Sequence, residues 1–321
     1  MRSLGSGACA VENLGLIESS MRIFLTGATG FIGRHVIRSL GTEHKIIALT
    51  QHVPEGKVPP HIHFVEGNLL REGEARRLAA RFPADLVLHL AWHVPPGEFW
   101  NSPQNLDWLA ASLLLARAFA EKGTPRVIYA GSGAEYDWNA NMPLKEDESP
   151  VKPRSLYGVC KNGLRQVLEA YTVSVGVSCL WCRIFWPYGR GEAPKKFLSD
   201  MMRAFRAGQP AVCHGANLER DYIHVEDIGH ALALAATSTL TGVLNIGSGE
   251  AVSLGDMARM AAEAAGRPDL LDLEQVRISE ETPKRVVASV ERLRGELGWT
   301  PRRSLSDGIT AMLEQTAEKD I

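Results

Sequence analysis

Tyr157 and Lys161 lie four residues apart, at the start of a segment whose apolar residues recur with a helical period at Leu164, Val167 and Leu168. This spacing places both polar side chains on one face of a helix, one turn apart. An ammonium beside a phenol favours the ionised phenol, so the pair could exchange a proton with a bound substrate. On the pair alone, a surface tyrosine over a solvated lysine is the favoured interpretation, so a catalytic role depends on the motifs around it.

A second group with chemical potential is the glycine-rich stretch TGATGFIG at residues 26–33. It follows an apolar run and opens an amphipathic stretch, which is the context that a dinucleotide-binding turn needs. Gly27 allows a tight turn, Gly30 lets a pyrophosphate approach the backbone, and Gly33 lets helix and strand pack closely. The helix N-terminus adds free N–H groups and partial positive charge. The stretch therefore predicts a site for the phosphates of a dinucleotide.

The elements that must position these residues alternate along the chain. Short apolar runs predict strands at residues 23–25, 46–49, 62–65, 86–90, 127–130 and 243–246. Amphipathic stretches between them predict helices, and such alternation implies βαβ units and a parallel sheet. The strand residues are continuously apolar, so we expect a sheet covered on both faces. The expected fold class is α/β: a Rossmann-type doubly wound parallel sheet with a smaller interleaved α/β C-terminal substrate domain.

The domain boundary is placed from a change of amino-acid composition after Gly189, where Gly, Pro and charged residues become more frequent. We place a dinucleotide-binding domain at residues 21–185, receiving a further strand near 243–248, and a mostly substrate-binding domain at 186–321. Residues 1–20 are small, polar and aperiodic, and lack the apolar core of a secretory signal. They are predicted to be a disordered extension, an alternative start or an expression remnant. Later helices are expected from the N-cap Ser253 and near residues 305–317.

Composition excludes several classes of function. The 321 residues are 45% apolar, which suffices for a sizeable core, and the formal net charge of -2 without a long basic run argues against nucleic-acid binding. No run reaches the ~18 apolar residues of a membrane span. Five irregularly spaced cysteines favour a reducing, cytoplasmic location without a disulfide framework. Cys179 and Cys182 have CxxC spacing, but no second pair accompanies them, so no metal site is predicted.

The GxxGxxG spacing, together with the Tyr157–Lys161 pair, resembles the short-chain dehydrogenase/reductase superfamily. The similarity is to its extended branch, the NAD(P)-dependent epimerases, dehydratases and reductases of nucleotide sugars. It runs from about Met21 to the C-terminus. Further matching pieces are HLA at 89–91, GS at 131–132, RIF and YG within 183–189, RDYIHVED at 220–227 and ELGWTP at 296–301. Each piece is weak alone, but the order of all of them is specific.

The resemblance implies roles for individual residues. Tyr157 is the general acid/base, Lys161 lowers the pKa of Tyr157 and hydrogen-bonds the nicotinamide ribose, and Ser132 hydrogen-bonds the substrate oxygen. Hydride then passes between the nicotinamide and a sugar carbon while Tyr157 moves the proton. The implied cofactor-binding residues, besides Tyr157 and Lys161, are Gly27, Gly30, Phe31, Ile32, Gly33, Thr50, Asn68, Leu69 and Ala91.

The end of the second strand bears on the choice of cofactor. NAD-preferring relatives usually hold an aspartate there for the ribose 2′-hydroxyl, whereas this chain has Thr50. The missing carboxylate removes repulsion against a 2′-phosphate, which Arg34, His52 or Lys57 could neutralise. We therefore expect NAD(P), with a lean to NADP(H). Asn68 replaces the usual aspartate at the adenine edge, where an amide can still hydrogen-bond.

The residues after Ser132 narrow the reaction. Related 4,6-dehydratases carry an Asp-Glu pair where this chain has Gly133 and Ala134. The 3,5-epimerase/reductases that resemble GDP-fucose synthase place a cysteine at the position of Ala134. Both reactions are disfavoured, which leaves 4-keto reduction or 4-epimerisation. The form Gly-Ser-x-x-Glu-Tyr resembles some 4-keto-6-deoxyhexose reductases, although Glu135 is more readily explained as a structural residue.

We therefore expect an NAD(P)-dependent enzyme acting on a nucleotide-activated sugar, foremost a 4-ketoreductase. The alternative is a nucleotide-sugar 4-epimerase with tightly bound NAD. An alternative of another class is a catalytically silent Rossmann binding module, since fold alone does not confer function. The intact set of Ser132, Tyr157 and Lys161 argues against silence.

The substrate and the oligomeric state complete the expectations. Arg220 matches an arginine that pairs with the nucleotide diphosphate, and Arg285 is a second candidate from a rough alignment. Trp186 replaces an asparagine that often contacts the substrate. Trp186 and four other aromatic residues could form a sugar pocket or a core: Trp92, Phe99, Trp100 and Trp138. Family members commonly pair through two helices, so a homodimer is expected, with no nucleic-acid or membrane partner.

Overall fold

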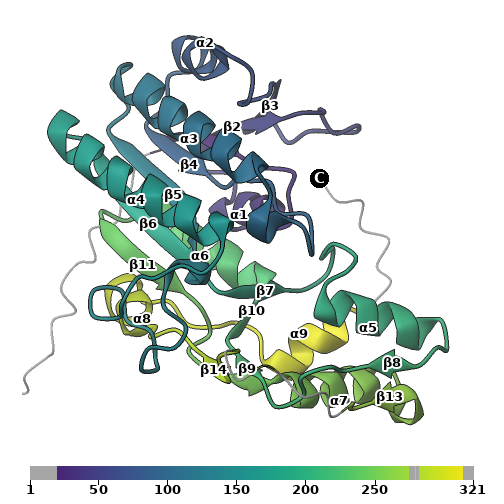
Figure 1. Cartoon of the computed structure of the whole chain (residues 1–321). Coiled ribbons are helices and arrows are strands. Elements are labelled where there is room, and N and C mark those ends of the chain that lie inside the picture. Colours follow the sequence, from purple (N-terminus) through teal and green to yellow (C-terminus); the bar gives the residue numbers. More distant parts are fainter. Residues whose placement is uncertain (1–19, 275–278, 280–281, 314–321) are drawn as a thin grey trace, which may run out of the picture.

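A seven-stranded sheet, parallel throughout, forms the centre of the molecule (Figure 1). Its order is β11-β6-β5-β4-β1-β2-β3, which confirms the expected α/β class with a doubly wound sheet. The strands are β1 Arg22–Thr26, β2 Lys45–Thr50, β3 Ile62–Glu66, β4 Leu86–His89, β5 Arg126–Ser132, β6 Ser178–Ile184 and β11 Gly242–Ile246. β5 runs two residues beyond the predicted strand, so Ser132 ends it.

The structure is a computed structural model that describes residues 20–274, 279 and 282–313 of the chain. The extension expected at the N-terminus lies outside the described residues, apart from Ser20. The end of the helix expected near 305–317 also lies outside them.

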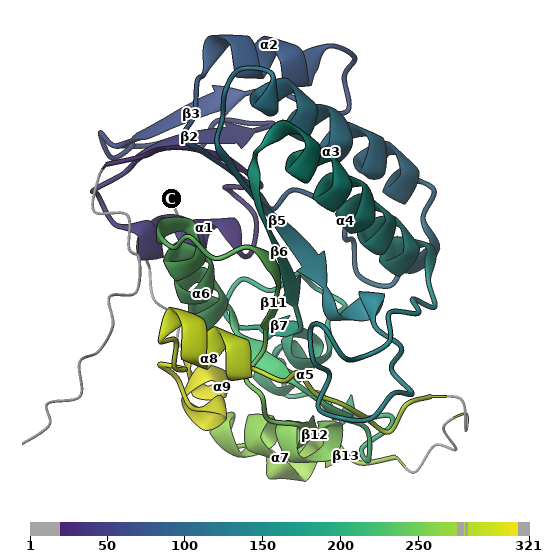
Figure 2. The same cartoon turned by 90° about the vertical axis from the view of Figure 1, so that its left-hand side faces the viewer.

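Helices cover both faces of the sheet (Figure 2). One face carries α1 Gly33–Leu40, α6 Val225–Thr237 and α8 Glu291–Leu297, and the other carries α2 Glu74–Arg81, α3 Gln104–Ala120 and α4 Leu156–Val175. Successive strand residues serve the two cores in turn: Ile23 and Leu25 pack with α1, whereas Phe24 packs with α3. The side chains of all three residues are fully buried. The continuous apolar strands predicted from the sequence follow from this double cover.

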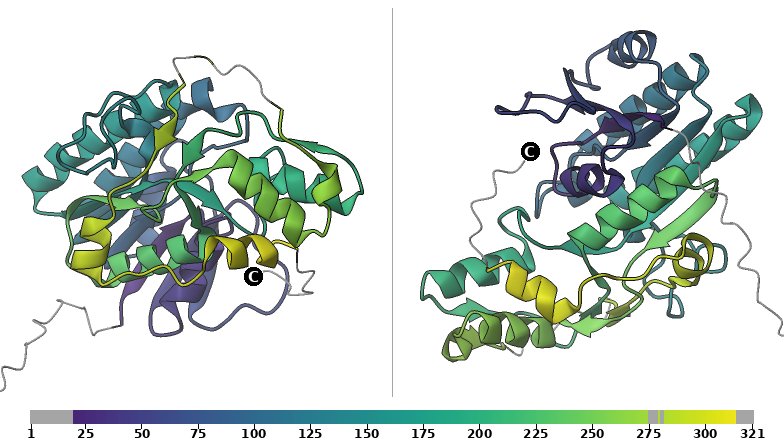
Figure 3. Two further views of the ribbon diagram at one scale, coloured as in Figure 1. Left: turned by 90° about the horizontal axis from the view of Figure 1, so that it is seen from below. Right: turned by 180° about the vertical axis from the view of Figure 1, so that it is seen from behind.

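A smaller layer lies beyond the carboxyl ends of the strands (Figure 3). It contains α5 Phe197–Arg206, α7 Leu254–Ala264 and α9 Leu305–Ala311 around a third core that includes Met201, Met257 and Ile309. Its short strands are β7 Trp186–Tyr188, β8 Ala211–Val212, β9 Glu219–Arg220, β10 Tyr222–His224, β12 Val252–Ser253, β13 Leu271–Asp272 and β14 Arg285–Val286.

Connections between the layers are interleaved. β11 leaves the smaller layer and pairs with β6, and both α6 and α8 pack on the sheet. Buried Asp221 ties these returns together, because its carboxylate accepts N–H bonds from Ser248, Gly249 and Ala288 at 2.7, 3.1 and 3.0 Å. Ser253 caps α7, as predicted, by accepting the N–H of Asp256. The arrangement holds the smaller layer over the carboxyl edge of the sheet, where open α/β sheets bind ligands.

Candidate active site

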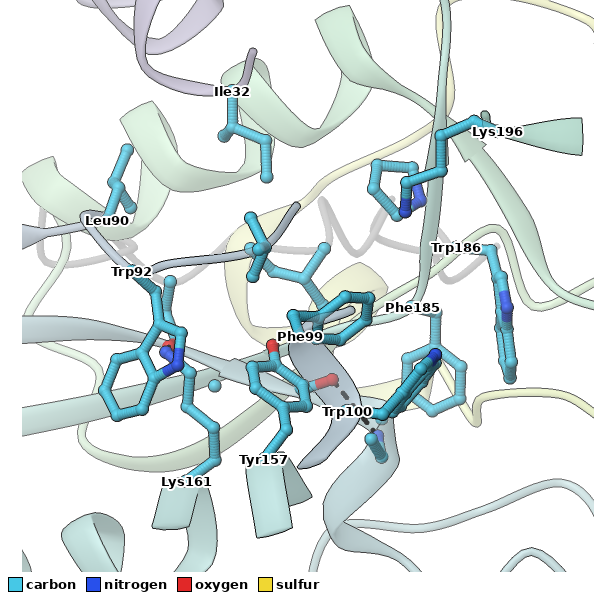
Figure 4. A pocket seen from close by; sticks show the side chains of 18 of the residues that line it. Ile32, Leu90, Trp92, Phe99, Trp100, Tyr157, Lys161, Phe185, Trp186 and Lys196 are labelled. Carbon is cyan, nitrogen blue, oxygen red and sulfur yellow. Dashed lines mark hydrogen bonds between the residues drawn. The ribbon is translucent and has the colours of Figure 1, made fainter. Parts of the chain in front are cut away.

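The pocket above the carboxyl edge of the sheet is lined by apolar residues and a group of aromatic side chains (Figure 4). Trp92, Phe99 and Trp100 come from the segment between β4 and α3, which includes the one-turn helix η1 Phe99–Asn101. Phe185 and Trp186 come from the segment that leaves β6. The aromatic residues singled out in the sequence, Trp138 included, therefore line a pocket instead of being confined to a core.

Ser132, Tyr157 and Lys161 meet at the floor of this pocket, as the sequence predicted. Ser132 ends β5 and is the N-cap of the one-turn helix η2 Gly133–Glu135. Tyr157 and Lys161 lie in the first two turns of α4, whose N-cap Ser155 accepts the N–H of Gly158 at 3.2 Å. A Cβ at Gly158 would overlap the carbonyl of Ala134 in η2, so a glycine is needed for α4 to approach Ser132.

Tyr157 is enclosed by aromatic rings. The centroids of the Phe99, Trp100 and Trp92 rings lie 4.9, 5.9 and 6.3 Å from that of Tyr157, all edge-on. Burial raises the pKa of Tyr157 to about 12, and a hydrogen bond with Ser132 opposes this rise. Desolvation outweighs the other influences on this pKa, and the lowering of the Tyr157 pKa by Lys161 together with the nicotinamide cation stays a prediction.

Lys161 is 3% exposed and is stabilised in two ways. Its Nζ donates a 2.7 Å hydrogen bond to the Ala130 carbonyl of β5 and lies 3.8 Å from the centroid of the Trp92 ring. Burial lowers the pKa of Lys161 to about 7, and the charge of Glu135 opposes this shift. Lys161 is thus a titratable group at neutral pH, whose ammonium is 5.9 Å from the Tyr157 ring centroid.

The glycine turn lies where β1 meets α1, next to Ala91, which follows β4. Gly27 has φ +71°, and a Cβ there would lie 2.9 Å from the Ala91 nitrogen, so only glycine fits. The Gly30 N–H bonds to the Gly27 carbonyl at 3.0 Å, and a Cβ at Gly33 would overlap the same carbonyl. Ile32 is the N-cap of α1 without a side-chain capping bond, while the N–H groups of Arg34 and His35 donate to the Gly30 and Ile32 carbonyls at 3.4 and 3.0 Å.

The remaining predicted cofactor residues lie at the ends of β2 and β3. Thr50 Oγ1 donates to the His52 carbonyl at 2.9 Å and lies 3.3 Å from Thr29 Oγ1. Asn68 Oδ1 accepts the Leu70 N–H at 3.0 Å and lines a second, polar pocket, while Leu69 is buried. Phe31 packs against the guanidinium of Arg34, 5.7 Å from its ring centroid.

The three predicted substrate residues are not all brought together. Trp186 lines the aromatic pocket, and the Arg220 guanidinium carbon lies 5.6 Å from its ring centroid. Arg220 Nη1 donates to the carbonyls of Glu219 and Lys284. Arg285 pairs in register with Glu219 and forms an exposed 2.8 Å ion pair with its carboxylate, so it does not line the pocket.

Sequence reasoning missed Lys196, which lines the pocket with its Nζ 5.7 Å from the Phe99 ring centroid. The adjacent pair of lysines at 195–196 was the only local signal for a cation here. Among the described residues, no cluster of three His, Cys, Asp or Glu side chains is placed to hold a metal ion. No helix in the described part of the chain is long and apolar enough to span a bilayer.

Comparison with known proteins decides the family. Residues 23–247 match the model of the NAD dependent epimerase/dehydratase family. The chain belongs to this family. The match covers more than half of the chain and contains the glycine turn, Ser132, Tyr157 and Lys161, so the protein is an NAD(P)-dependent enzyme of the extended short-chain type that acts on sugar nucleotides.

Individual relatives span nearly the same length. UDP-glucose 4-epimerase of Azospirillum brasilense is 28% identical over 320 residues, which cover 91% of this chain and 90% of the relative. The dTDP-6-deoxy-L-talose 4-dehydrogenase (NAD(+)) of Aggregatibacter actinomycetemcomitans is 27% identical over 243 residues, 73% and 87% of the two chains. The structure of MoeE5 with UDP-glucuronic acid and NAD superimposes with a TM-score of 0.76 at 30% identity, covering 91% and 97%. NAD is thus bound in a homologous structure.

Proposed function

We propose that this family member is a nucleotide-sugar 4-epimerase that keeps NAD bound through its catalytic cycle. The observation that carries the proposal is the convergence of Ser132, Tyr157 and Lys161 at the floor of one pocket. The similarity to a UDP-glucose 4-epimerase along almost the whole of both chains supports the same reaction. This places epimerisation ahead of the 4-ketoreductase that the sequence favoured.

The glycine turn fits a dinucleotide. The close approach of Gly27 to Ala91 keeps the turn free of side chains, and the partial positive charge at the start of α1 favours the pyrophosphate there. When bound, NAD accepts and returns a hydride. Tyr157 takes the proton of the sugar 4-hydroxyl and later returns it, and Ser132 donates a hydrogen bond to the same oxygen. The Lys161 ammonium, held by the Ala130 carbonyl, favours the ionised form of Tyr157 during the transfer.

A 4-ketoreductase is the second candidate, and the aromatic pocket favours it. Apart from the triad and Lys196, the lining side chains are apolar or aromatic. The indole N–H of Trp138 donates to the Gly133 carbonyl at 2.8 Å, and that of Trp92 donates to Asn105 Oδ1 at 2.8 Å. Neither N–H is therefore available to a sugar hydroxyl. Such a wall suits the methyl group of a 6-deoxysugar better than a hydroxymethyl group. This candidate releases its cofactor each cycle, and Thr50 then favours NADPH.

One experiment separates the two candidates. The purified protein is analysed for retained nicotinamide, then given UDP-glucose and, separately, dTDP-4-keto-6-deoxyglucose with NADH or NADPH. Retained NAD and interconversion of UDP-glucose with UDP-galactose without net cofactor consumption support the epimerase. Stoichiometric oxidation of NADPH by the keto sugar, with no retained cofactor, supports the reductase. Absence of both reactions contradicts the proposed function.

We also propose a cytoplasmic homodimer. The described cysteines Cys160, Cys179, Cys182 and Cys213 are free thiols, in keeping with a reducing compartment. Large apolar side chains are exposed on the neighbouring helices α3 and α4, and a partner would cover them: Leu106 and Leu114 on α3, and Val159 and Val167 on α4.

A further inference from the structure

A buried ion pair lies directly beneath the end of β5. The side chains of Glu135 and Arg183 are 0% and 1% exposed, and Glu135 Oε2 accepts the Arg183 Nε–H at 2.9 Å. The indole N–H of Trp181 donates to both carboxylate oxygens at 2.9 and 3.1 Å. Gly131 provides the space, since a Cβ there would overlap the Trp181 nitrogen and lie 2.7 Å from Glu135 Oε1. Glu135 is therefore held by buried partners and does not line the pocket.

The same carboxylate reaches the backbone of the residue that faces the substrate. Glu135 Oε1 accepts the Ser132 N–H at 2.8 Å, while Ser132 Oγ accepts the Ala134 N–H at 3.2 Å. This reciprocal pair is a capping box around the single turn of η2. The backbone of Ser132 is held from below, and one lone pair of its hydroxyl is already occupied.

These bonds determine what Ser132 can do. Because Ser132 Oγ accepts from Ala134, its proton remains available for donation into the pocket, toward the oxygen that Tyr157 also serves. We propose that Glu135 is a positioning residue, whose carboxylate tethers the Ser132 backbone so that the Ser132 hydroxyl donates to the substrate oxygen. The inference rests on the proposed C4 chemistry.

Glu135 itself does not exchange protons with the substrate. Gly133 and Ala134 of η2 line the pocket, but Glu135 does not. Its carboxylate is bonded to three donors, on Ser132, Trp181 and Arg183. Glu135 therefore acts through Ser132, and its removal should lower kcat more than it changes KM.

Two double variants isolate the tether from the buried charge. Glu135→Gln/Arg183→Met keeps an acceptor for the Ser132 N–H, whereas Glu135→Leu/Arg183→Met lacks it, and neither leaves an unpaired buried charge. We expect the Gln variant to keep kcat within about threefold of wild type. The Leu variant should lose at least about tenfold in kcat with KM for the nucleotide sugar nearly unchanged. Glu146→Gln is the matched control, because this neighbouring carboxylate accepts the Asn245 N–H at 2.9 Å without contacting Ser132.

A readout that does not depend on turnover completes the test. Hydrogen exchange of the Ser132 amide should be slow in wild type and the Gln variant, and at least about tenfold faster in the Leu variant. Should the Leu variant not fold, Glu135→Asp replaces it, because its carboxylate can keep the charge beside Arg183 but falls one methylene short of Ser132.

The outcomes are distinguishable. Equal kcat in the Gln and Leu variants, or unchanged exchange of the Ser132 amide in the variant without the acceptor, overturns the role of Glu135. Wild-type protein that converts neither UDP-glucose nor the keto sugar overturns the proposed function instead. In that case the amide exchange still decides whether Glu135 tethers Ser132.

Discussion

The ammonium of Lys161 lies 3.8 Å from the centroid of the Trp92 ring (Figure 4). The ring face and the Ala130 carbonyl replace part of the lost hydration. Desolvation still dominates and lowers the pKa of Lys161 to about 7. The enzyme therefore carries a costly buried charge at the centre of its site, which has consequences for stability.

Replacing Lys161 should stabilise the cofactor-free protein. The folded-state pKa of about 7 is below the ordinary lysine value of 10.5, so between these values the unfolded state binds more protons and stability rises with pH. Below about pH 7 Lys161 is protonated in both states, and the buried ammonium destabilises the folded state to its full extent. Lys161→Met should raise the free energy of unfolding by roughly 3–5 kcal/mol near pH 6, with the gain vanishing towards pH 10. Denaturant titrations measure this, with exposed Lys122→Met as control. A gain independent of pH would contradict the prediction.

Tyr157→Phe should abolish turnover while leaving the cofactor bound. The change removes only the hydroxyl that moves the proton, so kcat should fall by at least about 10²-fold with the cofactor Kd within about twofold. Tyr171→Phe, on the same helix but outside the pocket lining, is the control and should be active. Steady-state kinetics and cofactor titration measure both effects. Retention of a tenth or more of wild-type kcat would exclude Tyr157 as the acid/base.

Thr50→Asp should select against the phosphorylated cofactor. A carboxylate at the end of β2 would repel a 2′-phosphate and accept a bond from a 2′-hydroxyl. The ratio of kcat/KM for NADPH over NADH, measured with the keto sugar, should fall by about tenfold or more. Thr50→Val removes the hydroxyl without adding charge and should leave the ratio nearly unchanged. A fall of the same size in both variants would show that charge is not the cause.

Trp186→Asn should shift selectivity between sugars. The Trp186 ring packs 5.4 Å from that of Trp138 and forms part of the apolar wall. An amide there could bond to a sugar hydroxyl, so kcat/KM for a nucleotide hexose relative to its 6-deoxy analogue should rise by about tenfold. Trp186→Phe keeps the apolar wall and should preserve the ratio. Parallel changes for both sugars would argue that Trp186 acts only on folding.

Val167→Glu should convert the protein to monomers. Val167 is 51% exposed on α4, and Leu114 is 52% exposed on the neighbouring α3, which would share the interface. A buried unpaired carboxylate would oppose association at this face. Val212→Glu, 43% exposed in the smaller layer, is the matched control and should leave the dimer intact. Sedimentation at micromolar concentration tests the pair, and a wild-type monomer would refute the interface.

Much of the framework is local in origin and was predicted from the sequence. Apolar runs, their alternation with amphipathic stretches and the glycine spacing depend on neighbours within a few residues, so the sheet and the turn at Gly27 followed from them. The pairing of Tyr157 with Lys161 likewise needs only the helical repeat. Ser132 was found through its motif at the end of a strand.

The electrostatics of the site were decided by the tertiary structure. The pKa values of Tyr157 and Lys161 depend on how completely distant segments exclude water, and Trp92 and Phe99 arrive from the segment between β4 and α3. No local pattern encodes that enclosure, so the sequence did not predict the rise in the Tyr157 pKa that burial causes.

Contacts between residues far apart in the chain could not be predicted from the sequence either. Glu135 and Arg183, 48 residues apart, meet only because β5 and β6 are neighbours in the sheet. Lys196 reaches the pocket only because the smaller layer folds over the carboxyl edge. The sequence by itself thus determined the elements and the residues proposed as the catalytic set, because the elements depend on local periodicity and the residues on local motifs. Tertiary packing decided their protonation, their enclosure and the tether beneath Ser132, because desolvation and long-range hydrogen bonds exist only once the layers meet.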